Sequence, residues 1–231
     1  MNKFWNWSIL DESDEIEPER VLSLNGVIAE ESWFEDEVTP KVFSEELNSD
    51  GGDVTVRINS PGGDVFAAAQ IYNMLREYSQ NKGKVTVKID SLAASAASVI
   101  AMAGDEVLMS PVSMLMIHNP STIAAGERRD MEQAINMLDA VKNSIIEAYR
   151  KKTGISEKAL SDMMNDETWM NANMAIKKHF ADGYIGEKSS AENAVMFARV
   201  PFMQKVTAQM KTNLIPADEL YSRLNKLKSN F

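Results

Sequence analysis

Residues 54–75 read VTVRINSPGGDVFAAAQIYNML. Apolar residues in the first part of this stretch alternate with polar ones, which predicts a β-strand over residues 54–58. Ser60-Pro61-Gly62-Gly63-Asp64 then predicts the end of that strand, because proline and glycine interrupt regular pairing. Beyond this turn the apolar residues recur every three or four positions, as on one face of a helix. The stretch therefore reads as a strand, a tight turn and a helix.

A second unit of the same kind follows. Alternating apolar residues predict a strand at 85–89, and Ser91-Leu92-Ala93-Ala94-Ser95 leads into a helix of small residues predicted over 96–103. Repeated alternation of strands and helices predicts an α/β fold with a largely parallel sheet. In such sheets, sites form where strand ends turn into helix starts, which here are residues 58–65 and 89–96.

The flanking sequence extends this pattern in both directions. Residues 1–20 are predicted to form an acidic leader, residues 21–190 the main domain, and residues 191–231 a C-terminal helical extension. Further strands are predicted at 21–29, 107–109 and 114–117. Further helices are predicted at 40–47, 128–151, 156–164 and 172–180.

The overall composition narrows the possible functions. The chain has 231 residues, 44% of them hydrophobic, which is typical of a globular protein. A net charge of −10 argues against nucleic-acid binding, because no extended basic surface is available for a phosphate backbone. Without cysteine there is no thiol catalysis, and two histidines, His118 and His179, are too few for a multi-histidine metal site. No signal peptide or membrane-spanning apolar stretch is recognisable, so we expect a cytoplasmic protein with no membrane association.

Ser95 lies among alanines where the second strand gives way to a helix. A serine at a helix start often serves only as a cap. Its small neighbours, however, would let a substrate backbone approach the hydroxyl, and free N–H groups at the helix start could bind a developing oxyanion. Ser98 is a rival nucleophile, but it lies one turn inside the helix, where we expect its hydroxyl to bond a backbone carbonyl.

Two further features could complete a site around this serine. Adjacent glycines at 62 and 63 let backbone N–H groups point into a site without interference from a Cβ atom. His118 ends a predicted strand, and an ordinary pKa of about 6.5 suits it to proton transfer near neutral pH. His179 follows two lysines at a helix end, where we expect it to face the solvent or the helix terminus.

Several motifs, taken in chain order, resemble the Clp protease proteolytic subunit (ClpP) family. They are Ile58-Asn59-Ser60-Pro61-Gly62-Gly63, Ala93-Ala94-Ser95-Ala96-Ala97, Met116-Ile117-His118-Asn119-Pro120, Thr153-Gly154 and Glu167-Thr168-Trp169-Met170-Asn171-Ala172. The resemblance covers roughly residues 21–188. Three stretches are most similar to the phage and prophage branch, whose members are described as head maturation (prohead) proteases: Phe4-Trp5-Asn6, Ser32-Trp33-Phe34 and Ala93-Ala94-Ser95-Ala96-Ala97-Ser98.

The resemblance implies a role for each matched position. Ser95 matches the nucleophile of a serine endopeptidase and His118 its general base. The backbone N–H groups of Gly63 and Ala96 match the oxyanion hole. His118 would take the proton from Ser95 as it attacks a peptide carbonyl, and water would then release the acyl-enzyme, with no metal or cofactor.

The third member of the triad departs from the family pattern. Counted from Gly154, the family's aspartate falls on Glu167, whose carboxylate reaches one methylene further. Asp166, directly beside it, is the alternative acid. The resemblance also implies a spiral of strand-strand-helix units with an outer helical layer, assembled as stacked rings such as heptamers through the helix at 128–151.

Several biological roles are compatible with the sequence. The phage-like motifs favour a prohead protease that cuts scaffold or capsid precursors inside a forming procapsid. A degradative subunit that works with an unfoldase ATPase is the nearest alternative. A catalytically silent assembly protein would need no active Ser95. A crotonase-like enzyme would share the fold but act on acyl-CoA, and the sequence carries no recognisable CoA signature.

Overall fold

The computed structural model describes residues 20–31 and 38–186. The predicted leader, the C-terminal extension and the Phe4-Trp5-Asn6 and Ser32-Trp33-Phe34 motifs lie outside the described residues. The strands are β1 (Arg20–Ile28), β2 (Val54–Gly63), β3 (Val85–Ala94), β4 (Glu106–Met109), β5 (Met114–Ile117), β6 (Thr168–Asn171) and β7 (Gly183–Tyr184). The helices are α1 (Pro40–Leu47), α2 (Val65–Asn81), α3 (Ala96–Ala101), α4 (Arg128–Thr153), α5 (Glu157–Asn165) and α6 (Ala172–Lys177).

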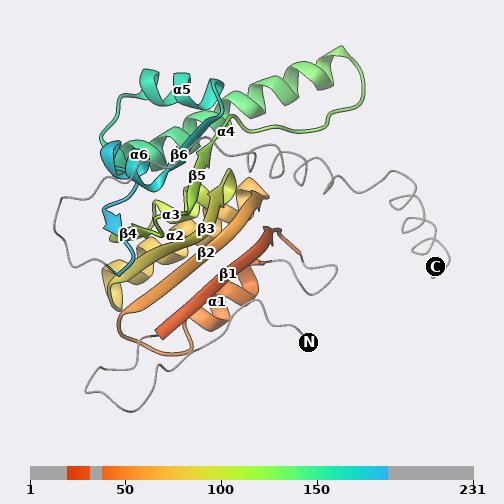
Figure 1. Cartoon of the computed structure of the whole chain (residues 1–231). Coiled ribbons are helices and arrows are strands. Elements are labelled where there is room, and N and C mark those ends of the chain that lie inside the picture. The colour runs from red at the N-terminus through yellow and green to blue at the C-terminus, as the bar shows by residue number, and fades with distance from the viewer. Residues whose placement is uncertain (1–19, 32–37, 187–231) are drawn as a thin grey trace, which may run out of the picture. The chain divides into compact units, whose positions relative to one another are not determined.

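The strands form one largely parallel sheet, as the sequence predicted (Figure 1). Its main path is β1-β2-β3-β4-β7, and every pair along this path is parallel. The long strand β3 has two partners, since residues 86–89 pair with β4 and residues 92–94 pair with β5. β6 then pairs with β5 in the antiparallel sense. β5 and β6 therefore form a branch beside the end of β3 that leads to Ser95.

Helices α1, α2 and α3 bury their apolar faces against this sheet. Ile58 and Ile89 on the central strands are fully buried, as are Ile71 and Leu75 on α2. Burial of a branched aliphatic side chain stabilises a fold by roughly 1.5–3 kcal/mol, so these residues anchor the junctions that follow β2 and β3. Helix starts are fixed locally, for example by Asp64, whose side chain accepts hydrogen bonds from two amides of the first turn of α2.

The Ser60-Pro61-Gly62-Gly63 motif does not end its strand, contrary to the sequence-based prediction. β2 continues through the motif, and Gly63 pairs with Ile28 of β1. Gly63 has a φ of +147°, and a Cβ atom there would collide with the carbonyl oxygen of Ile28. The missing side chain therefore allows the two backbones to stay paired, while register shifts in the ladders absorb the irregularity.

Three other boundaries differ from the prediction. β3 runs on to Ala94 instead of ending near residue 89, so it reaches the residue before Ser95. The short strands β6 and β7 were not predicted, because neither shows clear alternation of apolar and polar residues. In contrast, β5 has the bounds that the sequence indicated.

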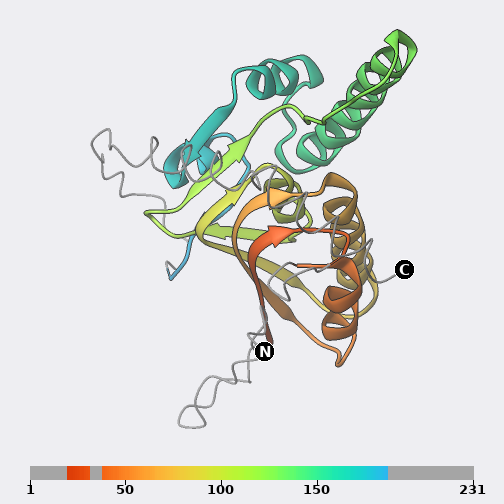
Figure 2. The same cartoon turned by 90° about the vertical axis from the view of Figure 1, so that its right-hand side faces the viewer.

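The C-terminal half of helix α4 packs into the core, and its N-terminal half projects from the domain. It begins with a capping box between Glu127 and Asp130 and ends at Gly154, which has a left-handed φ of 71°. Its fully buried residues all lie in the C-terminal part and are Ile145, Ile146, Ala148, Tyr149 and Thr153. The N-terminal half extends away from the sheet (Figures 1 and 2), leaving Ile135 58% and Met137 42% exposed.

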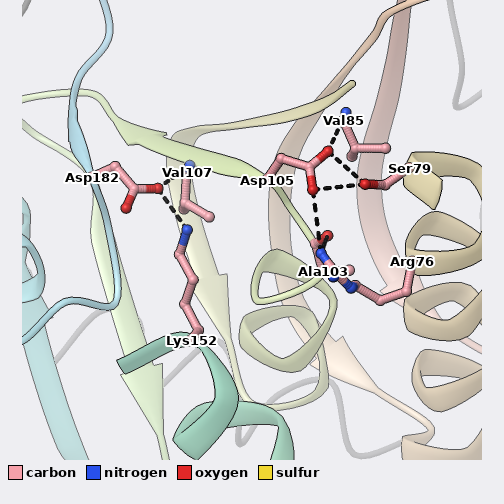
Figure 3. A network of polar contacts seen from close by, with 8 residues as sticks. All are labelled: Arg76, Ser79, Val85, Ala103, Asp105, Val107, Lys152 and Asp182. Atoms are coloured by element: carbon pink, nitrogen blue, oxygen red, sulfur yellow. Dashed lines mark hydrogen bonds and ion pairs between the residues drawn. The ribbon is translucent and has the colours of Figure 1, made fainter. Parts of the chain in front are cut away.

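Two aspartates tie helices to the sheet edge (Figure 3). Asp105 accepts hydrogen bonds from Ser79 of α2 and from the backbone N–H of Val85. Asp182 accepts from the backbone N–H of Val107 and from Lys152 near the end of α4, at 2.7 Å and 2.6 Å. The side chain of Lys152 is 12% exposed and that of Asp182 is 43% exposed, so this ion pair links the end of α4 to the sheet while its carboxylate remains in contact with solvent.

Among the described residues, none of the helices is both long and apolar enough to cross a membrane.

Candidate active site

Ser95 lies between the end of β3 and the start of α3, in a backbone conformation that serine rarely adopts. Its φ is 53° and its ψ is −125°, and its backbone N–H donates to the carbonyl oxygen of Met116 on β5. Such a conformation costs about 1–3 kcal/mol and persists only where the surroundings enforce it. The hydroxyl makes no capping hydrogen bond to the helix. The capping role that the sequence left open is therefore not the role of this serine.

The Ser95 hydroxyl instead meets a histidine. His118 follows the last residue of β5, and its Nε2 lies 2.7 Å from Ser95 Oγ. Because β3 and β5 are paired, both side chains leave the same edge of the sheet. Burial lowers the pKa of His118 below its ordinary value, and the negative charge of Glu167 partly offsets that effect. The imidazole is thus neutral at neutral pH, with Nε2 able to accept the serine proton.

The register between β5 and β6 decides which acidic residue approaches His118. Ile117 pairs with Thr168, so the residues just beyond this pair, His118 and Glu167, are brought to neighbouring positions. Glu167 has a φ of 47°, which is unusual for glutamate. Its carboxylate accepts a hydrogen bond from the indole N–H of Trp169 at 3.1 Å.

The structure separates the two candidate acids. Glu167 is near enough for its charge to raise the pKa of His118, although within the described residues the imidazole has no hydrogen bond to it. Asp166 ends α5, and its backbone N–H bonds the carbonyl oxygens of that helix. Of the two carboxylates, Glu167 is the one whose charge contributes to the pKa shift of His118.

The predicted oxyanion-binding positions lie in the same cavity as the serine and the histidine. Gly63, Ser95, Ala96 and His118 all line it, and its volume is about 250 Å³. A Cβ atom at the adjacent Gly62 would lie 2.8 Å from Ser95 Cβ and 3.0 Å from the backbone nitrogen of Ala96. The backbone at the glycine pair is therefore packed directly against the nucleophile turn.

The remaining walls of this cavity are largely apolar. They come from the start of α2, from α3 and from the middle of α4, and they include Val65, Phe66, Val99, Leu138 and Val141. Phe66 is 52% exposed at the rim. An open apolar cavity beside a serine hydroxyl can hold a hydrophobic side chain while the hydroxyl attacks a neighbouring carbonyl.

Ser98, the rival nucleophile, is buried and engaged elsewhere. Its hydroxyl donates to the carbonyl oxygen of Ser95 at 2.6 Å, as the sequence suggested, and it also lies 2.8 Å from the hydroxyl of Tyr149. Sequence reasoning placed Tyr149 only in the apolar stripe of its helix, and nothing in the helical spacing signals a polar role. His179 is exposed and lies outside the cavity, which agrees with the expected surface position.

Comparisons with known proteins identify the family of this chain. A family model described as Clp protease matches residues 8–188. The ATP-dependent Clp protease proteolytic subunit 1 of Protochlamydia amoebophila is 30% identical over 170 residues, which cover 71% of this chain and 81% of that protein. The subunit of the same name from Chlamydia muridarum is 30% identical over 153 residues, covering 64% of this chain and 78% of that protein.

A solved structure extends the likeness to the fold. A ClpP1 mutant from Listeria monocytogenes matches with a TM-score of 0.62 and 22% sequence identity, covering 73% of this chain and 92% of that chain. The likeness confirms the α/β fold of the ClpP type that the sequence predicted.

Proposed function

This chain belongs to the Clp protease family, and from that membership we propose that it is a serine endopeptidase with Ser95 as nucleophile and His118 as general base. The observation that carries the proposal is the 2.7 Å separation between His118 Nε2 and Ser95 Oγ at the cavity floor. A serine hydroxyl is a weak nucleophile by itself and needs an adjacent base within hydrogen-bond reach. The same pair argues against an acyl-CoA enzyme or a silent assembly protein, neither of which needs it.

The reaction follows from the placement of these groups. Neutral His118 accepts the proton of Ser95 as Oγ attacks the peptide carbonyl, and the resulting imidazolium then protonates the leaving amine. The N–H groups of Gly63 and Ala96 bind the oxyanion of the tetrahedral intermediate. A water molecule, activated by the same imidazole, finally releases the acyl group from Ser95.

We propose Glu167 as the acid of the triad, in preference to Asp166. Its charge favours the protonated form of His118, which is the form that develops in the transition state. A hydrogen bond from the imidazole to Glu167 would need its carboxylate to turn from the indole N–H of Trp169 or to accept from both groups. Hydrogen bonds of this kind often tighten only when substrate is bound.

Covalent labelling tests the nucleophile directly. A fluorophosphonate probe should label the wild-type protein, and Ser95→Ala should abolish the labelling. Ser79→Ala, which removes a serine hydroxyl on the outer helix α2, serves as the matched control and should be labelled like wild type. Labelling that persists in Ser95→Ala, or that is absent from assembled wild-type protein, would contradict the proposal.

For the biological role we propose processing of phage scaffold or capsid precursors during prohead maturation. This rests on the phage-like motifs of the sequence. The names of the relatives favour a second candidate, an ATP-dependent degradative subunit. Co-expression with a phage capsid or scaffold protein separates the two: cleaved capsid or scaffold protein supports processing. Intact capsid protein, together with substrate degradation that requires an unfoldase ATPase, supports the second.

We further propose that the protein assembles as stacked heptameric rings through the N-terminal half of α4. Large apolar side chains there are unusually exposed, among them Ile135 at 58% and Met137 at 42%. Exposed apolar surface on a projecting helix is typical of a protein–protein contact. Burial of this helix in a complex would also place another subunit close to the cavity that α4 borders.

A further inference from the structure

Three polar groups form a buried chain behind the nucleophile turn. The Tyr149 hydroxyl lies 2.8 Å from Ser98 Oγ, which lies 2.6 Å from the carbonyl oxygen of Ser95. Tyr149 is 1% exposed and Ser98 is fully buried. The chain therefore connects helix α4 to the backbone of the nucleophile without contact with solvent.

The direction of the hydrogen bonds follows from counting hydrogens. A serine hydroxyl has one hydrogen, and Ser98 uses it on the Ser95 carbonyl, which can only accept. The Tyr149 hydroxyl must then donate to Ser98 Oγ. Burial raises the pKa of Tyr149 far above its ordinary value, so the phenol keeps its proton. Each donation polarises the next hydroxyl and strengthens the bond that reaches Ser95.

The Ser95 carbonyl belongs to the same peptide unit as the Ala96 N–H. A trans peptide is planar, so its C=O and N–H point in opposite directions, and fixing one fixes the other. The carbonyl accepts a second hydrogen bond, from the backbone N–H of Ser98 at 2.9 Å. Together the two bonds resist rotation about ψ of Ser95, whose value of −125° is itself unusual.

From this geometry we propose that Tyr149 and Ser98 are positioning residues that aim the backbone N–H of Ala96 at the oxyanion of the reaction. The inference rests on the proposed function, because it assigns these residues to the oxyanion hole of the Ser95 site. Tyr149 borders the cavity but is only 1% exposed, and its hydroxyl is bonded to Ser98, which does not line the cavity. We therefore assign both residues an action through the Ser95–Ala96 peptide and not through direct contact with substrate.

The position of Tyr149 is itself well supported. Its ring packs edge-on against Phe180, with the ring centroids 5.6 Å apart. One turn later on α4, Lys152 is held by its ion pair with Asp182 (Figure 3). Contacts on both sides of Tyr149 therefore fix the end of α4 and hold the phenol against Ser98.

Tyr149→Phe removes only the first donor and is the primary test. Loss of an entire oxyanion donor lowers kcat by about 100-fold to 1,000-fold, so a donor that is loosened but still present should cost roughly tenfold to 100-fold. KM for a fluorogenic peptide should stay unchanged, because the oxyanion exists only in the transition state. Affinity for a peptide aldehyde, which forms an oxyanion on Ser95, should fall in parallel with kcat.

Tyr78→Phe is the matched control. Tyr78 is also buried, and its hydroxyl donates to the carbonyl oxygen of Gly52 at 2.8 Å, at the start of β2 and away from the catalytic edge. This variant should lose thermal stability but keep the kcat and aldehyde affinity of wild type. If the wild-type protein is active and labelled and Tyr149→Phe has the same kinetics, the positioning role of Tyr149 is wrong but the proposed function still stands.

A double variant separates positioning from general stability. Ser98→Ala leaves the Tyr149 hydroxyl buried without an acceptor, which should lower the melting temperature. Adding Tyr149→Phe removes that unpaired hydroxyl, so stability should recover while kcat stays low. Recovery of kcat together with stability would show a purely structural role and refute the proposal. Wild-type protein without labelling at Ser95 would refute both this inference and the proposed function.

Discussion

Replacing Gly62 with alanine should displace the nucleophile by a predictable amount. Gly62 has a φ of +98°, and its added Cβ would lie 2.8 Å from Ser95 Cβ and 2.7 Å from the carbonyl oxygen of Ala94. Non-bonded carbon atoms settle at about 3.5–4.0 Å, so the Ser95 side chain must retreat by about 1 Å. A misplacement of about 1 Å can cost 100-fold in rate, and we expect Gly62→Ala to lose roughly that factor in kcat.

Gly52→Ala isolates the collision from the backbone penalty. Gly52 has a similar φ of +88°, but a Cβ atom there meets nothing within 4 Å. Both variants therefore carry the cost of a left-handed alanine, about 1–2 kcal/mol of folding free energy, but only Gly62→Ala presses on Ser95. That cost is small against a typical domain stability of about 5–15 kcal/mol, so both proteins should fold.

The assay compares the two variants under conditions in which both are fully folded. Thermal unfolding first verifies that both are folded at the assay temperature. The rate constant for fluorophosphonate labelling and kcat for a fluorogenic peptide are then measured for each. Gly52→Ala should retain wild-type values, and Gly62→Ala should fall by about 100-fold in both. Equal labelling rates in the two variants would refute the claim that Gly62 supports the nucleophile turn.

Three further results are expected. Burial lowers the pKa of His118, and a protonated imidazole cannot accept a proton, so activity should rise with pH through a midpoint below 6.5. Glu167→Gln should move this midpoint lower still and reduce kcat, whereas Asp166→Asn should leave the midpoint in place. An upward shift of the midpoint in Glu167→Gln would contradict the argument. Lys152→Met should remove the ion pair at the end of α4 and lower the free energy of unfolding by up to about 1 kcal/mol in denaturant titration, because the 43% exposed Asp182 stays hydrated without its partner; a larger loss would contradict this reasoning. Ile135→Glu should weaken the proposed contact between rings, seen as smaller particles in sedimentation, while an unchanged particle size would place that contact elsewhere.

Local signals made several parts of the fold predictable. Thr39 before a proline and Gly154 after a basic turn mark helix ends through their own backbone preferences, and both appear in the structure where expected. Alternation within residues 54–58 and a short apolar run at 114–117 identified strands because neither pattern needs knowledge of the partner strand. The nucleophile turn could be proposed because small residues gathered at a strand-to-helix junction.

Features that depend on distant partners could not be predicted in this way. In the sequence Gly63 predicts the end of a strand, and only the close approach of Ile28 shows that this glycine permits strand pairing instead. The approach of Glu167 to His118 depends on the β5–β6 register, and the sequence of residues 168–171 carries no pattern that predicts this register. The hydrogen bond between Ser98 and Tyr149 joins residues 51 positions apart, and neither residue type alone indicates it.

The antiparallel pairing of β5 with β6 has a consequence for the protein during its own synthesis. A ribosome adds about 5–20 residues per second, so Glu167 is made several seconds after His118. β6 cannot pair with β5 until residues 168–171 have left the ribosome. A nascent chain thus contains the serine and the histidine for some time without the neighbouring carboxylate. The order of residues along the polypeptide delays completion of the proposed triad until the catalytic domain is almost fully translated.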